Sequence, residues 1–360
     1  MSWLFAFLGF ALLIILHELG HFAVAKWVGM RVERFSLFFP PLLARRQRGE
    51  TEYAIGAIPL GGYVKITGMN PHEDIPAEIA HRAYYKQPVW KRIAVIAAGP
   101  AVNIVLAFLI LWALFLVNGR VDADATRVGS VERGSPAAGQ LMPGDVLVAV
   151  DGKRGTIQEL SERISSHRCE GSQTAGCRAA RPAQITLVRG GREVTVRVRP
   201  VYDAQLTPPR TRVGIVFDRV IEDLGPVSAS GVAVSEMWHF TSGTVTTIAR
   251  ILDPEKRKEI SGVVGTYEVT RQAVKVDLTL AVYILAVISL SLGVINLFPF
   301  LPLDGGHIFW ALAEKVRGKA IPFAWLERAG FVGFALVLML FAIGLSNDIG
   351  RLTGEGFQIR

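Results

Sequence analysis

The sequence is poor in charged residues for its length. Of its 360 residues, 19% are charged and 51% are hydrophobic, and the mean hydropathy is +0.36. An ordinary soluble protein would carry more charge, and a chain buried wholly in lipid would carry fewer polar residues. The composition therefore predicts several membrane-spanning helices together with a water-exposed part.

Cysteine is also scarce, since Cys169 and Cys177 are the only two in the chain. Their spacing of eight residues is not that of a zinc site. Two interpretations stay open: two independent small residues, or a local disulfide formed in an oxidising compartment.

The sequence lacks a basic patch with interleaved aromatic residues, although its formal net charge is +8. Nucleic acid is therefore not an expected partner, and the scattered Lys and Arg favour contact with the anionic headgroups of membrane lipids. The start, MSWLFAFLGFALLIIL, lacks both a basic leading stretch and a small-residue cleavage site. We therefore expect a retained helix there and not a removable signal.

Four apolar runs are present, and the first three reach the roughly 20 residues that a bilayer-spanning helix needs. They cover residues 3–28, 93–117, 278–299 and, more shortly, 331–345. The sequence thus predicts a polytopic α-helical membrane protein with four transmembrane helices. The expected parts are a first span (1–29), a hairpin loop (30–91), a second span (92–118), an inserted domain (119–223), a helical return segment (224–277), a third span (278–306), a loop or helix (307–330), a fourth span (331–346) and a tail (347–360).

Lysine and arginine are concentrated in two loops. None precedes Lys26, whereas the loop after the first apolar run and the short loop after the third run are rich in both. By the positive-inside rule, both loops lie in the cytoplasm and both termini lie outside it. The long segment between the second and third runs is then extracytoplasmic as well.

The first loop contains TEYAIGAIPLGGYVKITGM, in which apolar and polar residues alternate. The alternation predicts a β-hairpin that turns at Gly61 and Gly62. Because the hairpin lies between two spans, it could re-enter the membrane where protein or water satisfies its backbone.

The extracytoplasmic segment from about residue 126 to 200 has the pattern of a small α+β domain. We expect a short helix over 135–138, a strand that ends at Asp151, a helix within TIQELSERISS and a hairpin about Gly190 and Gly191. Residues 224–252 predict an amphipathic helix that returns to the membrane.

The sequence HELGH lies inside the first apolar run. His17 and His21 are four residues apart, so a helix places both imidazoles on one face, where they can bind one Zn²⁺. Glu18 lies beside them and is the candidate general base for a water molecule that zinc activates near neutral pH. A chance match is the alternative, but three ionisable side chains in hydrocarbon are costly unless they are paired or bind a metal.

Catalytic zinc sites usually have a third protein ligand, and Asp304 is the best candidate. It stands in NLFPFLPLDGGH, where Pro299 and Pro302 break the third helix and the two following glycines allow close backbone approach. The charge-based topology gives Asp304 the same depth in the membrane as the two histidines. The alternative is that Asp304 caps the helix that follows. His307 is interpreted as structural.

Two amides expected to be buried have roles that the sequence leaves open. Asn296 lies eight residues before Asp304, and Asn103 lies in GPAVN of the second run. Each could donate to a developing oxyanion or hold a substrate strand, and a hydrogen bond between helices is an equal alternative. Gly99 and Pro100 indicate close packing or a kink near Asn103.

Together these motifs resemble the site-2 protease family of intramembrane zinc metalloproteases, and within it the bacterial regulator-of-sigma-E protease branch. The matching pieces follow in order along the chain: HELGH, GGYVK, GPAVN, the PDZ-like AAGQLMPGDVLVAVDGK and NLFPFLPLDGG. The resemblance implies zinc ligation by His17, His21 and Asp304, with Glu18 as the base and Asn296 positioning the substrate. It also implies that a strand at Gly61, Gly62, Tyr63, Val64 and Lys65 pairs with an extended substrate, which matches the physics of strand addition.

The chain departs from the family pattern in two places. Leu301 stands where the pattern has a second proline, and only one PDZ-like unit is visible where the branch often has two. The fold that the resemblance implies is four transmembrane helices with a re-entrant β-hairpin and one inserted extracytoplasmic PDZ-like α+β domain.

The activity that the resemblance implies is zinc-dependent intramembrane proteolysis, with one Zn²⁺ per chain. The expected substrates are transmembrane segments of single-span proteins, such as anti-sigma factors or signal-peptide remnants, that another protease has already trimmed. The expected location is the bacterial inner membrane, with the active site toward the cytoplasmic side. A zinc transporter and an inactive PDZ scaffold are the alternatives; transport favours acidic residues along several spans, and a scaffold has no need of Glu18.

Overall fold

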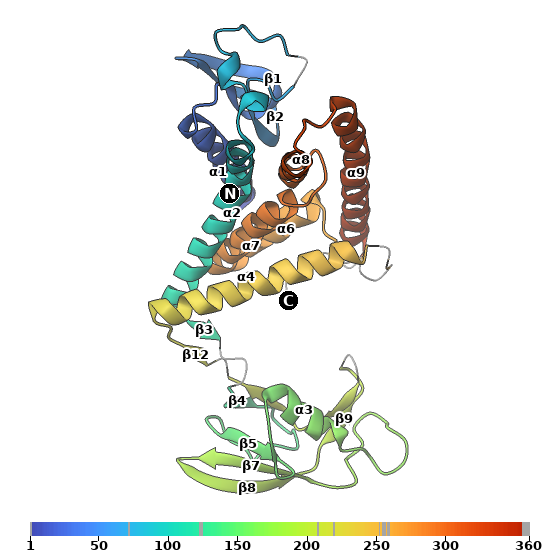
Figure 1. Ribbon diagram of the computed structural model, residues 1–360. Helices are drawn as coiled ribbons and strands as arrows, with labels where there is room; N and C mark the ends of the chain where they lie inside the picture. The colour runs from blue at the N-terminus through green and yellow to red at the C-terminus, as the bar shows by residue number, and fades with distance from the viewer. Residues whose placement is uncertain are drawn as a thin grey trace. The chain divides into compact units, whose positions relative to one another are not determined.

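The computed structural model describes residues 2–70, 73–121, 125–206, 209–218, 220–251, 253, 257 and 260–354. The chain forms two compact units (Figure 1). The first combines Met1–Phe115 with Pro226–Arg360, and the second is Leu116–Gly225. Residues 355–360 of the expected tail lie outside the described residues.

The first unit is built on four long apolar helices. They are α1 (Ser2–Trp27), α2 (Val89–Asn118), α7 (Leu278–Asn296) and α9 (Phe323–Thr353). All four are long and apolar enough to cross a membrane, which confirms the four predicted spans. The prediction for the fourth, 331–345, is too short, because α9 continues through Asp348, whose side chain finds partners inside the protein.

The helix of the third span ends earlier than predicted. α7 stops at Asn296, and Asp304 begins a separate helix, α8 (Asp304–Arg317), so the span does not run to residue 306 as one helix. Pro299 and Pro302 lie in the turn between them and lack the N–H that a continuing helix would need.

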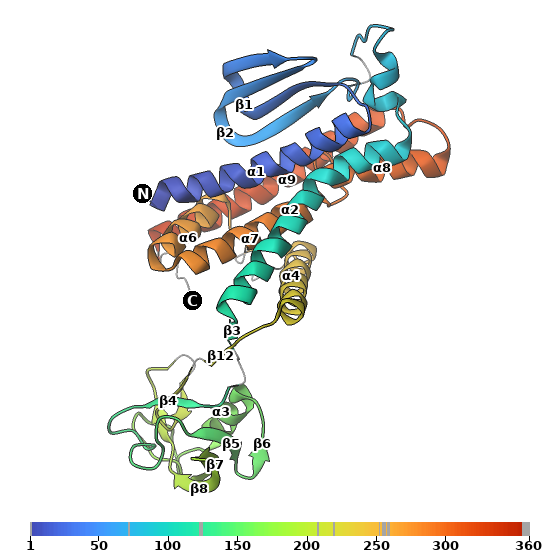
Figure 2. The ribbon, with the colours of Figure 1, turned by 90° about the vertical axis from the view of Figure 1, so that its left-hand side faces the viewer.

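A sheet of two long strands follows α1 (Figure 2). The strands are β1 (Val32–Arg48) and β2 (Thr51–Ile66). The turn between them is at Gly49 and Glu50, so the turn predicted at Gly61 and Gly62 is wrong. Both of these glycines lie inside β2, where Gly62 pairs with Leu37.

The middle of β1 is paired on both of its sides, because two separate parts of β2 pair with it. Residues 34–37 pair with residues 52–55 on one side and with residues 62–65 on the other. Residues 61–66 are therefore an outer strand, whose second backbone edge meets no strand among the described residues.

Two further helices complete the core of the first unit. α6 (Val263–Val276) packs against α1, α7 and α9, and α4 (Pro226–Ala249) runs across α7 (Figures 1 and 2). Ala233 of α4 and Ala286 of α7 meet Leu111 of α2 in a small apolar cluster. A helix is thus present over most of the predicted range 224–252, as α4, whereas its amphipathic character and its return to the membrane stay predictions.

Asp348 ties α9 to the beginning of α6. Its fully buried carboxylate accepts hydrogen bonds from the backbone N–H groups of Gly262 and Gly265, at 3.1 and 2.7 Å, and from the Ser261 hydroxyl at 3.3 Å. N–H groups in the first turn of a helix have no partner within the helix, so the carboxylate supplies the missing acceptor.

The second unit is an α+β domain around a four-stranded sheet in the order β6–β5–β7–β8. α3 (Ile157–Ser166) begins with a capping box between Thr156 and Glu159 and buries Leu160 and Ile164 in the core. The strands of the unit are β3 (Arg120–Val121), β4 (Val128–Val131), β5 (Val146–Val150), β6 (Lys153–Arg154), β7 (Ala183–Arg189), β8 (Arg192–Val198), β9 (Val201–Asp203), β10 (Arg210–Arg212), β11 (Ile215–Phe217) and β12 (Ile221–Glu222).

Most local predictions for this unit hold. The strand expected to end at Asp151 is β5, TIQELSERISS forms α3, and β7 and β8 turn about Gly190 and Gly191. The helix predicted over 135–138 is wrong, because these residues form turns between Gly134 and Gly139, both with positive φ (74° and 77°).

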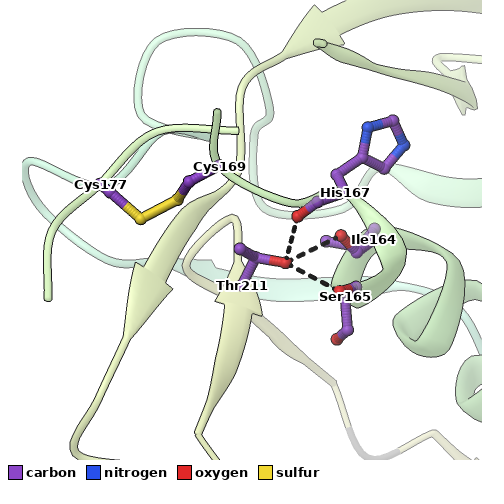
Figure 3. The surroundings of a disulfide bond; sticks show 6 residues. All are labelled: Ile164, Ser165, His167, Cys169, Cys177 and Thr211. Carbon is purple, nitrogen blue, oxygen red and sulfur yellow. Dashed lines mark hydrogen bonds between the residues drawn. A yellow bond between two sulfur atoms is a disulfide. The ribbon is translucent and has the colours of Figure 1, made fainter. Parts of the chain in front are cut away.

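Cys169 and Cys177 form a disulfide, as in the second interpretation of the two cysteines; the oxidising compartment of that interpretation stays a prediction (Figure 3). The bridge closes part of the loop after α3, next to Thr211 of β10. The Thr211 hydroxyl lies 3.3, 3.0 and 2.8 Å from the carbonyl oxygens of Ile164, Ser165 and His167, so it provides a polar partner at the end of α3.

Candidate metal centre

His17 and His21 lie one turn apart on the same face of α1. Both side chains are buried, with 7% and 8% of each residue exposed, and their rings meet edge to face. The two Nε2 atoms are 3.2 Å apart. The spacing predicted from HELGH therefore holds, and both ring nitrogens face the same point.

Asp304 of α8 brings a third ligand atom to this point. Its Oδ2 lies 3.2 Å from Nε2 of His17 and 3.3 Å from Nε2 of His21. Among the described residues, no other histidine, cysteine or carboxylate joins this cluster. The structure thus brings together the three ligands that the sequence predicts from two distant segments.

The spacing of the three atoms fits a zinc ion. Ligands about 2.0–2.2 Å from a tetrahedral zinc lie roughly 3.3–3.6 Å from one another. In addition, Oδ2 of Asp304 is buried and makes no hydrogen bond of good geometry within the described residues, which suits a metal ligand. Two imidazoles and one carboxylate leave a fourth position for water or substrate.

The turn between α7 and α8 positions Asp304. The helix N-cap is Leu303, without a side-chain hydrogen bond, so the predicted alternative in which Asp304 caps the helix is wrong. Oδ2 of Asp304 faces the Nε2 atoms of both imidazoles, so the carboxylate points at the same place as the two histidines, as a shared metal ligand must.

Three glycines let the chain fold tightly around this turn. A Cβ atom at Gly305 would overlap the carbonyl of Leu297, and one at Gly306 would lie 2.5 Å from the carbonyl carbon of Phe300. On α9, a Cβ atom at Gly333 would overlap the carbonyl of Leu301. The sequence analysis identified the first two glycines but gave no sign of Gly333, which lies about 30 residues further along.

α2 packs against the rings of both histidines. The ring Nδ1 of His21 lies 2.9 Å from the backbone carbonyl of Val95 and donates to it, which leaves the lone pair of Nε2 free for a metal. A Cβ atom at Gly99 would overlap Nε2 of His21 and lie 2.9 Å from Cε1 of His17. Gly99 of GPAVN is therefore required by the two imidazoles, which the sequence analysis did not identify.

Asn103 lies on the same face of α2, four residues after Gly99. It is fully buried, and its Nδ2 is 3.3 Å from Nδ1 of His17. Its backbone carbonyl accepts a hydrogen bond of 2.9 Å from the Ser289 hydroxyl of α7. Asn103 is enclosed between helices in this structure, with its backbone carbonyl bonded to α7, and its assignment among the substrate-binding residues stays a prediction.

Glu18 of α1 follows His17 directly, and its side chain lies against the outer strand of the sheet. A Cβ atom at Gly62 would lie 3.0 Å from Cγ of Glu18, so Gly62 makes room for this side chain. The structure therefore brings the candidate base beside the GGYVK segment.

The remaining residues of GGYVK are anchored within the sheet. The Tyr63 hydroxyl accepts a hydrogen bond of 3.1 Å from Arg34. Val64 packs against the apolar cluster formed where α1, the sheet and α2 meet. The exposed Lys65 forms ion pairs with Glu33 and Glu73 at 2.6 and 3.2 Å. These side chains brace the strand, while Gly61 and Gly62 face Phe39 and Glu18.

Asn296 is the last residue of α7 and is half-buried, whereas the sequence analysis expected a buried amide. Its position at the helix end keeps it on the same turn that leads to Asp304. His307, in the first turns of α8, is largely enclosed, and burial lowers its pKa below the usual value. It lies outside the three-ligand cluster, as expected.

A buried ion pair that the sequence analysis missed links α2 to α8. Arg92 is only 8% exposed, and its two terminal nitrogens donate to the two carboxylate oxygens of Glu314 at 3.0 and 2.7 Å. The pair joins the helix that supports the histidines to the helix that begins with Asp304. The only signal in the sequence was a charged residue at the edge of an apolar run.

Comparison with known proteins is consistent with this site. The family model of peptidase family M50 matches residues 5–340. A Brucella suis protein is 32% identical, over 93% of this chain and 92% of its own length, and a Rhizobium meliloti protein is 30% identical over 95% of each. A Campylobacter jejuni protein is 29% identical, over 95% of this chain and 92% of its own length. All three are named "Putative zinc metalloprotease".

The comparisons identify the metal cofactor of the chain and its membrane location. Zinc is the metal of this family, so it is the cofactor of this chain, and the four apolar helices belong to a multi-pass membrane protein. The match runs through nearly the whole sequence, from the first apolar helix into the fourth. The chain therefore belongs to peptidase family M50, the site-2 protease family of membrane zinc metalloproteases.

Proposed function

We propose that this chain is an intramembrane endopeptidase that cleaves the transmembrane segments of single-span proteins already trimmed by another protease. One observation carries the proposal. The zinc-ligand cluster and the side chain of Glu18 lie together on or beside helices that are apolar enough to cross a membrane. Such groups are costly in hydrocarbon unless they serve a function there.

His17, His21 and Asp304 are the proposed zinc ligands. Zinc supplies Lewis-acid chemistry, since it activates a water molecule near neutral pH and polarises the carbonyl that is attacked. The chain's own contribution is to hold three donors at fixed spacing and to keep a fourth position open. The buried Val95 carbonyl and the missing Cβ of Gly99 keep the His21 ring in place.

Glu18 is the proposed general base. It lies one residue from His17 and packs against Gly62 of the outer strand, so it faces the place where an extended substrate would lie. Its carboxylate takes a proton from the attacking water and returns it to the leaving amine. Asn296, at the end of α7, is proposed to donate to the oxyanion or to hold the substrate near this point.

The outer strand of the sheet is the proposed substrate platform. A transmembrane helix must unwind before its peptide bond can be attacked, and the unwound segment then needs partners for its backbone groups. Residues 61–66 offer one unpaired backbone edge beside Glu18. Strand addition there would satisfy the substrate backbone and bring the scissile bond to the zinc.

The proposed setting is the bacterial inner membrane, with both termini outside the cytoplasm and the active site toward the cytoplasmic side. The charged loops support this orientation. The disulfide between Cys169 and Cys177 supports an oxidising compartment for the second unit. We propose that this unit is a PDZ-like domain that screens substrates by binding new C-termini or excluding bulky ectodomains.

The test is co-expression of the chain with single-span reporter proteins, with fragment size measured by electrophoresis and zinc measured in the purified protein. We expect the wild type to cut within the reporter's transmembrane segment. Glu18→Gln should abolish cleavage and retain zinc, whereas His17→Ala should lose both. Cleavage by Glu18→Gln at the wild-type rate would refute the mechanism, and zinc flux in proteoliposomes without any cleavage would favour a transporter.

A further inference from the structure

α2 meets the two metal-facing histidines with different chemical groups. Nδ1 of His21 faces a backbone carbonyl, which can only accept, so its proton lies on Nδ1 and Nε2 is free to bind a metal. Nδ1 of His17 faces the side-chain amide of Asn103, which can either donate or accept. The protonation pattern of His17 therefore depends on which end of that amide it meets.

We propose that Asn103 is a positioning residue for His17: its side-chain oxygen accepts the Nδ1 proton of His17 in the zinc-loaded protein, which fixes the tautomer whose Nε2 binds the metal. The inference rests on the proposed function, in which His17 is a zinc ligand. It gives Asn103 a role that involves neither the substrate nor the oxyanion.

The side-chain amide of Asn103 can take two orientations, and the structure shows the cost of the one it adopts. Nδ2 of Asn103 lies 3.3 Å from Nδ1 of His17, while its Oδ1 is buried without a hydrogen-bond partner within the described residues. In this orientation Nδ1 accepts, and the proton of a neutral His17 lies on Nε2, the atom that faces Asp304. A rotation of the side-chain amide of Asn103 by 180° exchanges the positions of its Oδ1 and Nδ2. Oδ1 then accepts from Nδ1, and Nε2 is free, as it already is in His21.

The geometry of α2 supports this reading. Val95, Gly99 and Asn103 recur every four residues, so one face of α2 presents an acceptor, a gap and a second possible acceptor to the two imidazoles of α1. Histidines that bind metals commonly donate their other nitrogen to such a partner. The side chain of Asn103 is not needed to join helices, because its backbone carbonyl already bonds to Ser289 of α7.

Three substitutions separate the acceptor role from packing. Asn103→Leu keeps the volume and removes the acceptor, Asn103→Asp keeps an acceptor and removes the donor, and Ser289→Ala removes the bond to the Asn103 backbone only. The measurement is zinc affinity of the full-length protein in detergent, by competition with a chelator of known affinity. We expect the zinc Kd to rise about 10- to 100-fold in Asn103→Leu and to stay within a few-fold of wild type in the other two.

The outcomes distinguish the role of Asn103 from the proposed function itself. If Asn103→Leu binds zinc like wild type while His17→Ala does not, the role of Asn103 is overturned and His17 remains a ligand. If Asn103→Asp or Ser289→Ala weakens binding as much as Asn103→Leu, packing or donation is the cause and the inference is overturned as well. If His17→Ala binds zinc like wild type, the proposed function fails.

A measurement on the unaltered protein covers the case in which the variants do not fold. Nitrogen-15 NMR of the histidine-labelled, zinc-loaded chain reports which ring nitrogen carries the proton. We expect Nδ1 to be protonated in both His17 and His21. A proton on Nε2 of His17, or an Nδ1 of His17 without a proton, would overturn the inference.

Discussion

The metal cluster of the first unit and the core of the second unit use polar groups in opposite ways. In the first unit, His17, His21 and Asp304 face one another and are left with ligand positions open. In the second unit, the buried polar side chains Asp145 and Thr211 are fully engaged by neighbouring groups and hold turns and helix ends. The contrast separates polar groups that serve the site from polar groups that serve the fold. It predicts that substitutions at the metal cluster affect zinc and catalysis, whereas those at polar groups that serve the fold affect stability.

Gly99→Ala should have the largest effect, because the added methyl would occupy the space of the two imidazoles. We expect zinc affinity to fall about 10- to 100-fold and cleavage to fall about 100-fold, since displacement of a site by about 1 Å has that cost. Zinc content and reporter cleavage are the measurements. Gly231→Ala on α4 is the matched control, because a Cβ atom there meets nothing within 4 Å. Normal zinc binding by Gly99→Ala would contradict the conclusion that the two imidazoles require a glycine at this position.

Asp145→Ala tests the other side of the comparison. Asp145 is 2% exposed, accepts two hydrogen bonds from Arg189 at 2.8 and 2.7 Å, and accepts one from the backbone N–H of Met142. Its loss should destabilise the second unit by about 3 kcal/mol. Hydrogen exchange in β5 and β7 should accelerate, while zinc content stays at the wild-type value. A loss of zinc in this variant would show that the two units are coupled.

Removing the disulfide should have a slightly smaller effect on the same unit. With Cys169→Ser and Cys177→Ser, the short closed loop no longer restricts the unfolded chain, and the expected loss is about 2.5 kcal/mol. The thermal unfolding temperature of the full chain, with and without reductant, is the measurement. The double variant should be insensitive to reductant, and a wild type that is equally insensitive would contradict the prediction.

Glu50→Gln sharpens the comparison from within the first unit, because Glu50 serves the fold and not the metal cluster. It joins Lys26 at the end of α1 to Arg82, and the pKa of Glu50 is lowered to about 2 chiefly by its bonds to Arg82. A carboxyl group with a lowered pKa stabilises the fold above its unfolded value near 4.5 and loses this effect as the pH falls toward 2.

Solvent screening limits the contribution of Glu50 to about 1 kcal/mol at neutral pH. Unfolding temperatures of Glu50→Gln and wild type should therefore differ slightly at pH 7 and converge as the pH approaches 2. Zinc binding should not change. A difference that grows in acid would mean that Glu50 acts through another interaction.

The sequence allowed the parts of the site that depend on local spacing to be predicted. The helical spacing of His17 and His21 predicted their common face, and Asp304, the third ligand expected from the sequence, lies beside both imidazoles; the membrane depth inferred from the loop charges stays a prediction. Length and hydropathy were enough for the four spanning helices, since a bilayer requires about 20 apolar residues.

The parts that depend on contact between distant segments could not be predicted in this way. Gly61 and Gly62 were interpreted as a turn because paired glycines usually mark one. The structure gives Gly62 a different reason, which is clearance for the side chain of Glu18. Likewise, no spacing rule connects Gly99 to the histidines or Arg92 to Glu314, because 78 or more residues separate the partners.

The placement of α9 has a mechanical consequence. Near its start, Gly333 lies against the turn that carries Asp304, and near its end, Asp348 holds the first turn of α6. α9 therefore contacts two parts of the first unit, which are the turn before Asp304 and the first turn of α6. Displacing this helix from its neighbours would therefore break its contact with the Leu301 carbonyl and its hydrogen bonds to the start of α6 together.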